Sequence, residues 1–130
     1  MVMQADINGP QRKVLLATVR PAKTAHGASG IALRRGRTLP FVIYRQWSAP
    51  AGYYPEQWFL VVPDTKEVLH EGPVRRETLI WGLQSITELT DTVTTPIELE
   101  PGTYKIVFAL GGLLGGEVDV EVFEAAEEAA

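Results

Sequence analysis

The sequence predicts an all-β domain, an antiparallel β-sandwich or partly closed barrel with an extended N-terminal arm. Short apolar stretches recur along the chain, Gly- and Pro-rich turn signals separate them, and no long amphipathic helix is visible. With 130 residues, 45% of them hydrophobic, the chain is large enough to form one domain around its own core.

The N-terminal part of the chain predicts an arm followed by a strand. Residues 1–12 are mostly polar, contain Gly9-Pro10 and show no periodicity, so we expect them to lie outside the core. Residues 13–20 read as a strand, and the small polar residues 21–30 read as a connector. We expect a β domain over residues 13–124 and a solvated C-terminal tail over 125–130, which is too short to hold a helix alone.

Two segments in the middle of the chain leave alternatives open. Residues 31–47 have extended character, but Gly36 and Pro40 interrupt them, so they predict either two strands or one kinked strand. Residues 78–94 combine apolar residues at helical spacing with many threonines, and we expect a short helix or an irregular crossover followed by a strand. Between these segments, residues 57–62 (QWFLVV) are apolar on both faces, as in a central strand.

The C-terminal part of the chain predicts a hairpin with one buried face. Apolar and other residues alternate over 103–110 and again over 117–124, and pairs of glycines bracket the connection. The residues expected to face the core are Tyr104, Ile106, Phe108, Leu110, Val118, Val120 and Val122. Glu117, Asp119 and Glu121 are expected to form an acidic face in water.

The run Leu99-Glu100-Pro101-Gly102-Thr103-Tyr104 resembles the entry to a late strand in immunoglobulin-like and fibronectin-like sandwiches. In such a tyrosine corner the tyrosine hydroxyl bonds back to the backbone a few residues upstream. The resemblance implies an immunoglobulin-like or β-tulip-like sandwich and says nothing about activity.

Charge is unevenly distributed along the chain. The segment up to Trp47 carries eight basic residues and one acid, and since the net charge is −4 the remainder carries −11. This pattern favours either interleaved charges on one surface or a basic segment that meets an acidic protein surface. We expect no nucleic-acid partner, because the acidic body would repel phosphate. No apolar run is long enough to cross a membrane and no signal peptide is recognised.

No combination of residues predicts an active site, so we expect a non-enzymatic protein. There is no cysteine, and nothing in the sequence ties His26 to His70. Glu98 and Glu100, like the acidic row in the hairpin, are best explained as solvated strand faces. We therefore expect no catalytic residue, no metal site and no cofactor.

Two apolar features are candidate binding surfaces. Trp47, Tyr53, Tyr54 and Trp58 surround a Pro/Gly loop, and their rings could stack on a sugar or a peptide. For the two tryptophans, packing in the core is favoured over this binding role by about two to one. Leu113 and Leu114 are placed at the tip of the predicted hairpin. Because apolar residues at a loop tip are usually covered, this tip is a candidate subunit contact.

A basic arm, an acidic β body and an apolar hairpin tip together resemble the decoration, or cement, proteins on the capsids of long-tailed bacteriophages. The resemblance implies a virion location, a homotrimer and a capsid shell partner, with Arg12, Lys13, Arg20 and Lys23 as arm contacts. A single asparagine, no cysteine and frequent Pro, Glu and Arg favour a thermophilic host. The alternatives are a carbohydrate- or peptide-binding module, with a cytoplasmic location if the assembly hypothesis fails, and an accessory domain of a larger machine.

Overall fold

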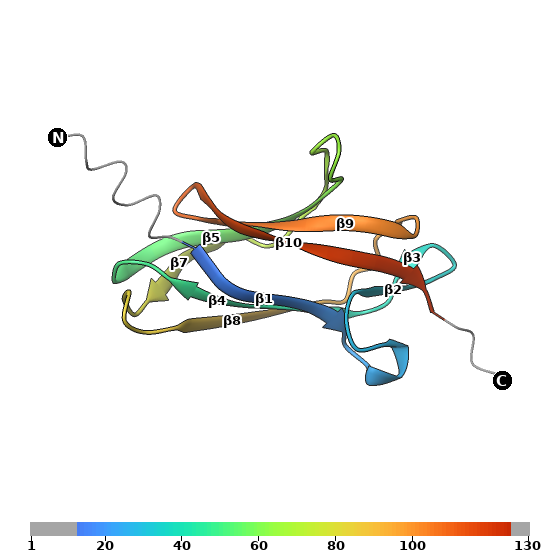
Figure 1. Cartoon of the computed structure of the whole chain (residues 1–130), viewed down its shortest axis with the longest axis horizontal. Helices are drawn as coiled ribbons and strands as arrows, with labels where there is room; N and C mark the ends of the chain where they lie inside the picture. The colour runs from blue at the N-terminus through green and yellow to red at the C-terminus, as the bar shows by residue number, and fades with distance from the viewer. Residues whose placement is uncertain (1–12, 126–130) are drawn as a thin grey trace.

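Two β-sheets pack face to face in the computed structural model, which describes residues 13–125 (Figure 1). The smaller sheet has the strand order β1-β4-β8. Its strands are β1 (Lys13–Pro21), β4 (Phe41–Ser48) and β8 (Thr87–Val93). The larger sheet has the order β3-β2-β10-β9-β5-β6, and β7 also pairs with β5. Its strands are β2 (Ile31–Arg34), β3 (Arg37–Thr38), β5 (Gly52–Val61), β6 (Val68–Glu71), β7 (Arg75–Ile80), β9 (Gly102–Leu110) and β10 (Leu113–Glu124).

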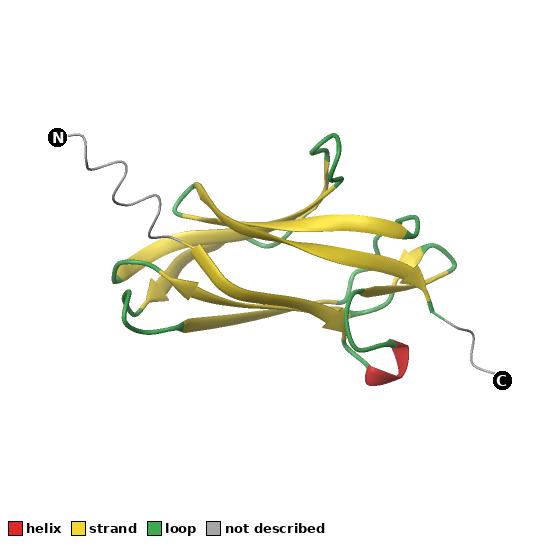
Figure 2. Cartoon of the chain, viewed as in Figure 1, coloured by secondary structure: helices red, strands yellow, loops and turns green. Residues whose placement is uncertain are grey.

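The arrangement confirms the predicted all-β sandwich. Strands pair antiparallel throughout, except that β10 pairs parallel with β2. The described residues contain one short 3-10 helix, Thr24–His26, in the connection from β1 to β2 (Figure 2). That connection carries the chain from the smaller to the larger sheet, where the Gly30 N–H donates to the Val19 carbonyl at 2.7 Å. The two sheets therefore meet closely along the β1 and β10 side.

The core lies between the sheets and is built from alternate residues of their strands. Fully buried side chains include Phe41, Ile43 and Trp47 of the smaller sheet, and Trp58 and Leu60 of the larger one. The expected inward face of the C-terminal hairpin is also confirmed, because Ile106, Phe108 and Leu110 are fully buried and Val120 and Val122 nearly so. A side-chain repeat of two residues explains this pattern.

The ambiguous segment 78–94 contains no helix. Strand β7 ends at Ile80 and β8 begins at Thr87, with an irregular loop between them, so the crossover alternative is confirmed and the short helix is wrong. The buried residues of this segment are Thr78 and Ile80 of β7 and Thr87 of β8, and all three lie in strands. Of the apolar residues at helical spacing, Leu79, Ile80 and Leu89 lie in strands β7 and β8, whereas Leu83 and Ile86 are exposed in the loop.

The segment 31–47 forms three strands where one or two were expected. Its first break is a tight turn at Arg35 and Gly36, which have φ angles of 55° and 77° and join β2 to β3. Both angles are positive, as a type I′ turn requires. The Glu124 carboxylate accepts hydrogen bonds from the N–H groups of Arg35 and Gly36 at 3.1 and 2.8 Å, so the end of β10 holds this turn.

The predicted tyrosine corner is present. The Tyr104 hydroxyl donates to the Glu100 carbonyl at 2.7 Å and thereby fixes the path of the chain into β9.

Candidate functional site

The outer face of the larger sheet is apolar at its centre, which is unusual for a surface in contact with water. In β5 the residues Trp58 and Leu60 face the core, so Gln57 and Phe59 face outward. In β9 the outward positions are Val107 and Ala109. Phe59 pairs directly with Val107, and Gln57 with Ala109, so these side chains form one continuous patch.

Two depressions open on this face, with volumes of about 400 and 350 Å³. They share Phe59 and Leu114, so we describe them together as the outer groove. The first depression is also lined by Val61, Lys66, Val68, Val107 and Glu117. The second is lined in addition by Pro55, Glu56, Gln57, Val74, Ala109 and Gly112. Figure 1 shows that the β5–β6 loop and the β9–β10 hairpin rise from the same face of the sheet.

The hairpin tip orients Leu114 into the groove. Gly111 and Gly112 have φ angles of 65° and 82° and form the turn, and a register shift follows between Leu114 and Gly116. Leu114 is 74% exposed and lines both depressions, whereas Leu113 is 46% exposed and lines neither. The two leucines that the sequence pointed to are therefore not equivalent.

The base of the hairpin packs closely against the smaller sheet at two glycines. A Cβ atom at Gly115 would lie 2.3 Å from the Trp47 ring, and one at Gly116 would lie 3.2 Å from the Cβ of Val14. At Gly115 only the absence of a side chain allows this approach, whereas a Cβ atom at Gly116 would require Val14 to move by a few tenths of an ångström. The tip is thus a supported projection from the sandwich.

Acidic residues border the groove on β10. Glu117, Asp119 and Glu121 are exposed, as predicted, and we refer to them as the acidic row. Lys105 on β9 forms ion pairs with Glu117 and Asp119 at 3.0 and 2.7 Å. Hydrogen bonds from Lys105 to these two carboxylates raise the pKa of its ammonium group. Thr103 also donates to Glu121.

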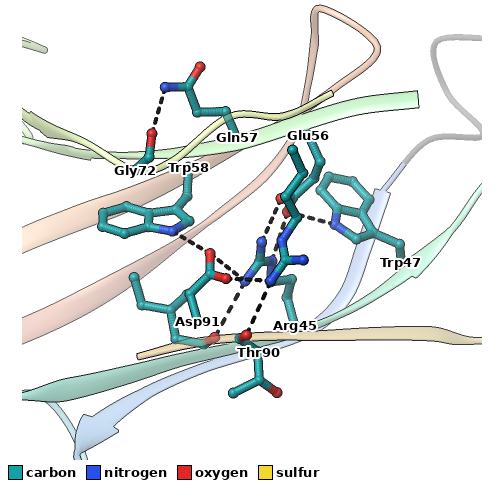
Figure 3. Close-up of polar contacts among 10 residues, drawn as sticks. Arg45, Trp47, Glu56, Gln57, Trp58, Gly72, Thr90 and Asp91 are labelled. Atoms are coloured by element: carbon teal, nitrogen blue, oxygen red, sulfur yellow. Dashed lines mark hydrogen bonds and ion pairs between the residues drawn. The ribbon is translucent and has the colours of Figure 1, made fainter. Parts of the chain in front are cut away.

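A second polar feature is buried between the sheets (Figure 3). Arg45 of β4 and Glu56 of β5 form a fully buried ion pair, in which Arg45 Nε and Nη2 donate to the two carboxylate oxygens at 2.7 and 2.5 Å. Trp47 Nε1 donates to the same carboxylate at 3.0 Å. A bidentate pair with a third donor satisfies a carboxylate that would otherwise be costly to bury.

Asp91 of β8 extends this network toward the edge of the sandwich. Its carboxylate accepts hydrogen bonds from Trp58 Nε1 at 2.9 Å and from Arg75 Nη2 at 2.5 Å, and it lies 3.3 Å from Arg45 Nη1. Burial raises the pKa of Asp91, but attraction by Arg45 and hydrogen bonds from Arg75 and Trp58 outweigh it, so the pKa is lowered. The network joins β4 and β8 of the smaller sheet to β5 and β7 of the larger sheet, so it ties the two sheets together.

The aromatic residues predicted around the Pro/Gly loop separate into different environments. Trp47 and Trp58 are fully buried, and Tyr54 is half-buried with its hydroxyl donating to the Pro50 carbonyl at 2.6 Å. Only Tyr53 is strongly exposed, at 68%. The sequence reasoning missed Trp81, which is 65% exposed and lies two residues beyond Leu79, the strand partner of Tyr53.

The other predicted positions do not converge on one site. Arg12 lies outside the described residues, while Lys13, Arg20 and Lys23 are exposed on β1 and the loop after it. His70 packs near Trp58, with ring centroids 5.7 Å apart, and His26 belongs to the 3-10 helix. Within residues 13–125 no group of three or more His, Cys, Asp or Glu side chains could hold a metal ion. No helix in that part of the chain is long and apolar enough to cross a membrane.

Comparisons with known proteins match the fold alone. No family model and no curated protein matches the sequence. Among solved structures, the Pseudomonas fluorescens alkylpurine DNA glycosylase AlkC bound to DNA with an abasic site analogue is similar, with a TM-score of 0.50, 14% identity, and coverage of 87% of this chain and 30% of that one. A β-glucosidase from Listeria innocua in complex with isofagomine has a TM-score of 0.51 and 11% identity, and covers 86% of this chain and 17% of that one.

A third solved structure is the CARDB domain of the Pyrococcus furiosus protein PF1109 in complex with di-metal ions. It has a TM-score of 0.44 and 9% identity, and the match covers 87% of this chain and 94% of that one. The chain therefore spans less than a third of the glycosylase and less than a fifth of the glucosidase.

Proposed function

We propose that this chain is a non-enzymatic assembly domain that binds a neighbouring protein through the outer groove. The observation that carries this proposal is the exposure of Leu114 beside Phe59 and Val107, on a sheet face that is otherwise bordered by charge. Contiguous apolar surface of this kind, rimmed by polar residues, is typical of protein contact sites. The supported hairpin presents Leu114 without needing to reorganise.

A capsid decoration role is the specific form of assembly that we propose. The partners would be further copies of this chain, in a trimer, and a capsid shell protein on the virion surface. The acidic row and the basic β1 segment would set the orientation of these contacts, because complementary charges specify register and speed encounter. A thermophilic host remains part of this proposal.

Solution mass and a leucine pair test the groove. Sedimentation velocity of the intact chain should give about three times the 14.3 kDa of one copy, or show association with capsids of a long-tailed phage that lack their own decoration protein. Leu114→Ser should weaken that association by about thirtyfold or more if Leu114 is a hot spot, since truncating a hot-spot residue costs about 2 kcal/mol or more. Leu113→Ser is the matched control and should leave association intact. Equal behaviour of the two variants would contradict the proposal.

A ligand-binding module is the second candidate, and the exposure of Tyr53 on β5 and of Trp81 in the loop after β7 favours it. Their rings could stack on a sugar face or a peptide. Because Trp47 and Trp58 are fully buried, a change in tryptophan emission with added oligosaccharide would report on Trp81. Binding that Trp81→Ala removes, in a chain that stays monomeric, would favour this candidate over assembly.

A further inference from the structure

Two adjacent leucines are exposed on β1, and we refer to them as the leucine pair. Leu15 and Leu16 are 44% and 49% exposed. Regular alternation would turn one of two neighbouring residues inward, but the register of β1 against β4 shifts between Val14 and Leu16, and a bulge of this kind leaves the extra residue unpaired. Because neither leucine lines the outer groove, the leucine pair is a second, separate apolar surface.

The strand that carries the leucine pair is positively charged. Residues 13–26 contain Lys13, Arg20 and Lys23 and no Asp or Glu. In the part of the chain that the structure describes, none of these three cations takes part in an ion pair. β1 therefore presents an apolar contact and positive charge on the same strand.

The outer groove continues along the larger sheet into negative charge. Pairing between β9 and β10 places Leu114, Glu117 and Asp119 in three consecutive rows on the outer face. The acidic row as a whole has three carboxylates, and Lys105 supplies one ammonium group to it, which leaves two negative charges in excess. One end of this surface is thus apolar and the other is acidic.

The spacing of these features agrees between the two surfaces. On β1, Leu16 and Arg20 are both exposed and four residues apart, so their side chains share one face and lie about 14 Å apart. On the larger sheet, the β9 partners of Leu114 and Asp119 are also four residues apart. A second copy of β1 laid along β10 can therefore fill the apolar rows with the leucine pair while Arg20 reaches Asp119.

We propose that the outer groove of one copy receives the leucine pair of a second copy, with Arg20 of that copy against the acidic row. This inference rests on the proposed function and identifies the surface that occupies its groove. Each chain has one groove and one leucine pair on different sheets, so the contact is heterologous. Heterologous contacts form rings when the rotation between copies closes, and a ring of three is the trimer of the proposed function.

Mixing two variants tests this contact directly. Leu114→Ser changes the groove and Leu16→Asp changes the leucine pair, and each alone should weaken self-association about thirtyfold or more in sedimentation velocity. An equimolar mixture should nevertheless form a dimer of twice 14.3 kDa. The reason is that the Leu16→Asp chain keeps an intact groove and the Leu114→Ser chain keeps an intact leucine pair. Such a dimer has no second intact contact and should not grow further.

Thr92→Asp is the matched control for the added charge. Thr92 is exposed on β8, the other edge strand of the smaller sheet, so this variant should associate like the wild type. Circular dichroism establishes that each variant is folded before mixing, and Leu15→Asp replaces Leu16→Asp if the latter does not fold.

A charge exchange tests the register without changing either leucine. Arg20→Glu should weaken self-association, and adding Asp119→Arg in the same chain should restore it, because every contact then regains an opposite pair. If the double variant associates no better than Arg20→Glu, Arg20 does not meet the acidic row.

A mixture of folded variants that stays monomeric would overturn the inference, as would a Leu16→Asp chain that associates like the wild type. A wild-type chain that stays monomeric would also overturn it. If that monomer still binds capsids, and Leu114→Ser removes the binding, the proposed function holds with the shell protein as the occupant of the groove. The two failures are therefore distinguishable.

Discussion

At the scale of single residues, we expect the loss of either member of the Arg45–Glu56 pair to be strongly destabilising. Both side chains are fully buried, so neither charge can turn to water if its partner is lost. Removing one member of a buried pair costs about 3 to 5 kcal/mol, because the other charge remains uncompensated. The pair also joins β4 to β5, and thus one sheet to the other.

Glu56→Gln should therefore lower the free energy of unfolding by about 3 kcal/mol or more, measured by urea denaturation. Glu98→Gln is the control: Glu98 is paired with Arg37 at 3.6 Å but strongly exposed, and the change should be under about 1 kcal/mol. The double replacement Arg45→Met/Glu56→Leu should recover most of the loss, as isosteric apolar pairs do at buried sites. Equal losses in the Glu56 and Glu98 variants would show that the buried pair is not important for stability.

Asp91 makes the stability of the folded chain sensitive to acid. Since its pKa is lowered in the folded state, its contribution is present above its ordinary value of 3.8 and is lost as the pH falls through the lower folded value. Asp91→Asn should be less stable than the wild type at pH 7, but should lose less stability between pH 5 and pH 2. Denaturation midpoints across that range measure the effect. Asp64→Asn, in an exposed turn, should keep the wild-type pH profile.

Sequence reasoning could not identify these residues as buried. Arg45 and Glu56 are charged residues in strands, and such residues are normally assigned to solvated faces. Their burial depends on which strands of the two sheets come to face each other, and periodicity does not encode that. Trp47 and Trp58 were correctly expected to favour the core, but their N–H partners, Glu56 and Asp91, follow only from the packing.

At the scale of elements, the tyrosine corner should contribute measurably to stability. Tyr104→Phe removes the hydroxyl that donates to the Glu100 carbonyl and should cost about 0.5 to 1.5 kcal/mol. Tyr53→Phe is the control, because the Tyr53 ring is mostly exposed, and we expect less than about 0.5 kcal/mol. Thermal or urea unfolding measures both. If the Tyr104 variant is as stable as the control, this hydrogen bond does not stabilise the fold.

Strands with strict alternation of apolar and polar residues were predictable from the sequence, whereas the irregular loop between β7 and β8 was not. The C-terminal hairpin has a repeat of two and Gly-rich turns, and both its strands and its inward face are confirmed. Residues 78–94 show helical spacing because two exposed loop residues, Leu83 and Ile86, fall between the apolar residues of β7 and β8. The outer groove did leave a signal: residues 57–62 are apolar on both faces, which we attributed to a doubly covered central strand.

At the scale of the whole molecule, the fold joins distant parts of the chain. β2, near the start, pairs in parallel with the end of β10, through Val122–Ile31, Phe123–Ala32 and Glu124–Leu33. Such long-range pairing was not predictable from sequence, because no local pattern specifies which strands become neighbours. Fold class followed from strand patterns, whereas sheet order had to come from the structure.

Truncation of the C-terminus tests this closure. Removing residues 126–130 deletes none of the pairing described above, so the free energy of unfolding should change by less than about 0.5 kcal/mol. Removing residues 123–130 also deletes the Glu124 bonds to the β2–β3 turn and the Ala125 N–H bond to the Leu33 carbonyl. At about 1 kcal/mol per lost hydrogen bond, with Phe123 lost as well, this should cost roughly 3 to 5 kcal/mol.

Urea denaturation of the two truncated chains measures that difference, and Glu124→Gln separates the contribution of the carboxylate from that of the strand. We expect Glu124→Gln to retain part of the stability, because its amide oxygen can still accept one N–H bond at Arg35 or Gly36. If the chain lacking 123–130 unfolds at the same urea concentration as the chain lacking 126–130, the parallel β2–β10 pairing does not close the sandwich. In that case the β1 and β10 side must be held mainly by core packing, since Val19, Val120 and Val122 are buried there.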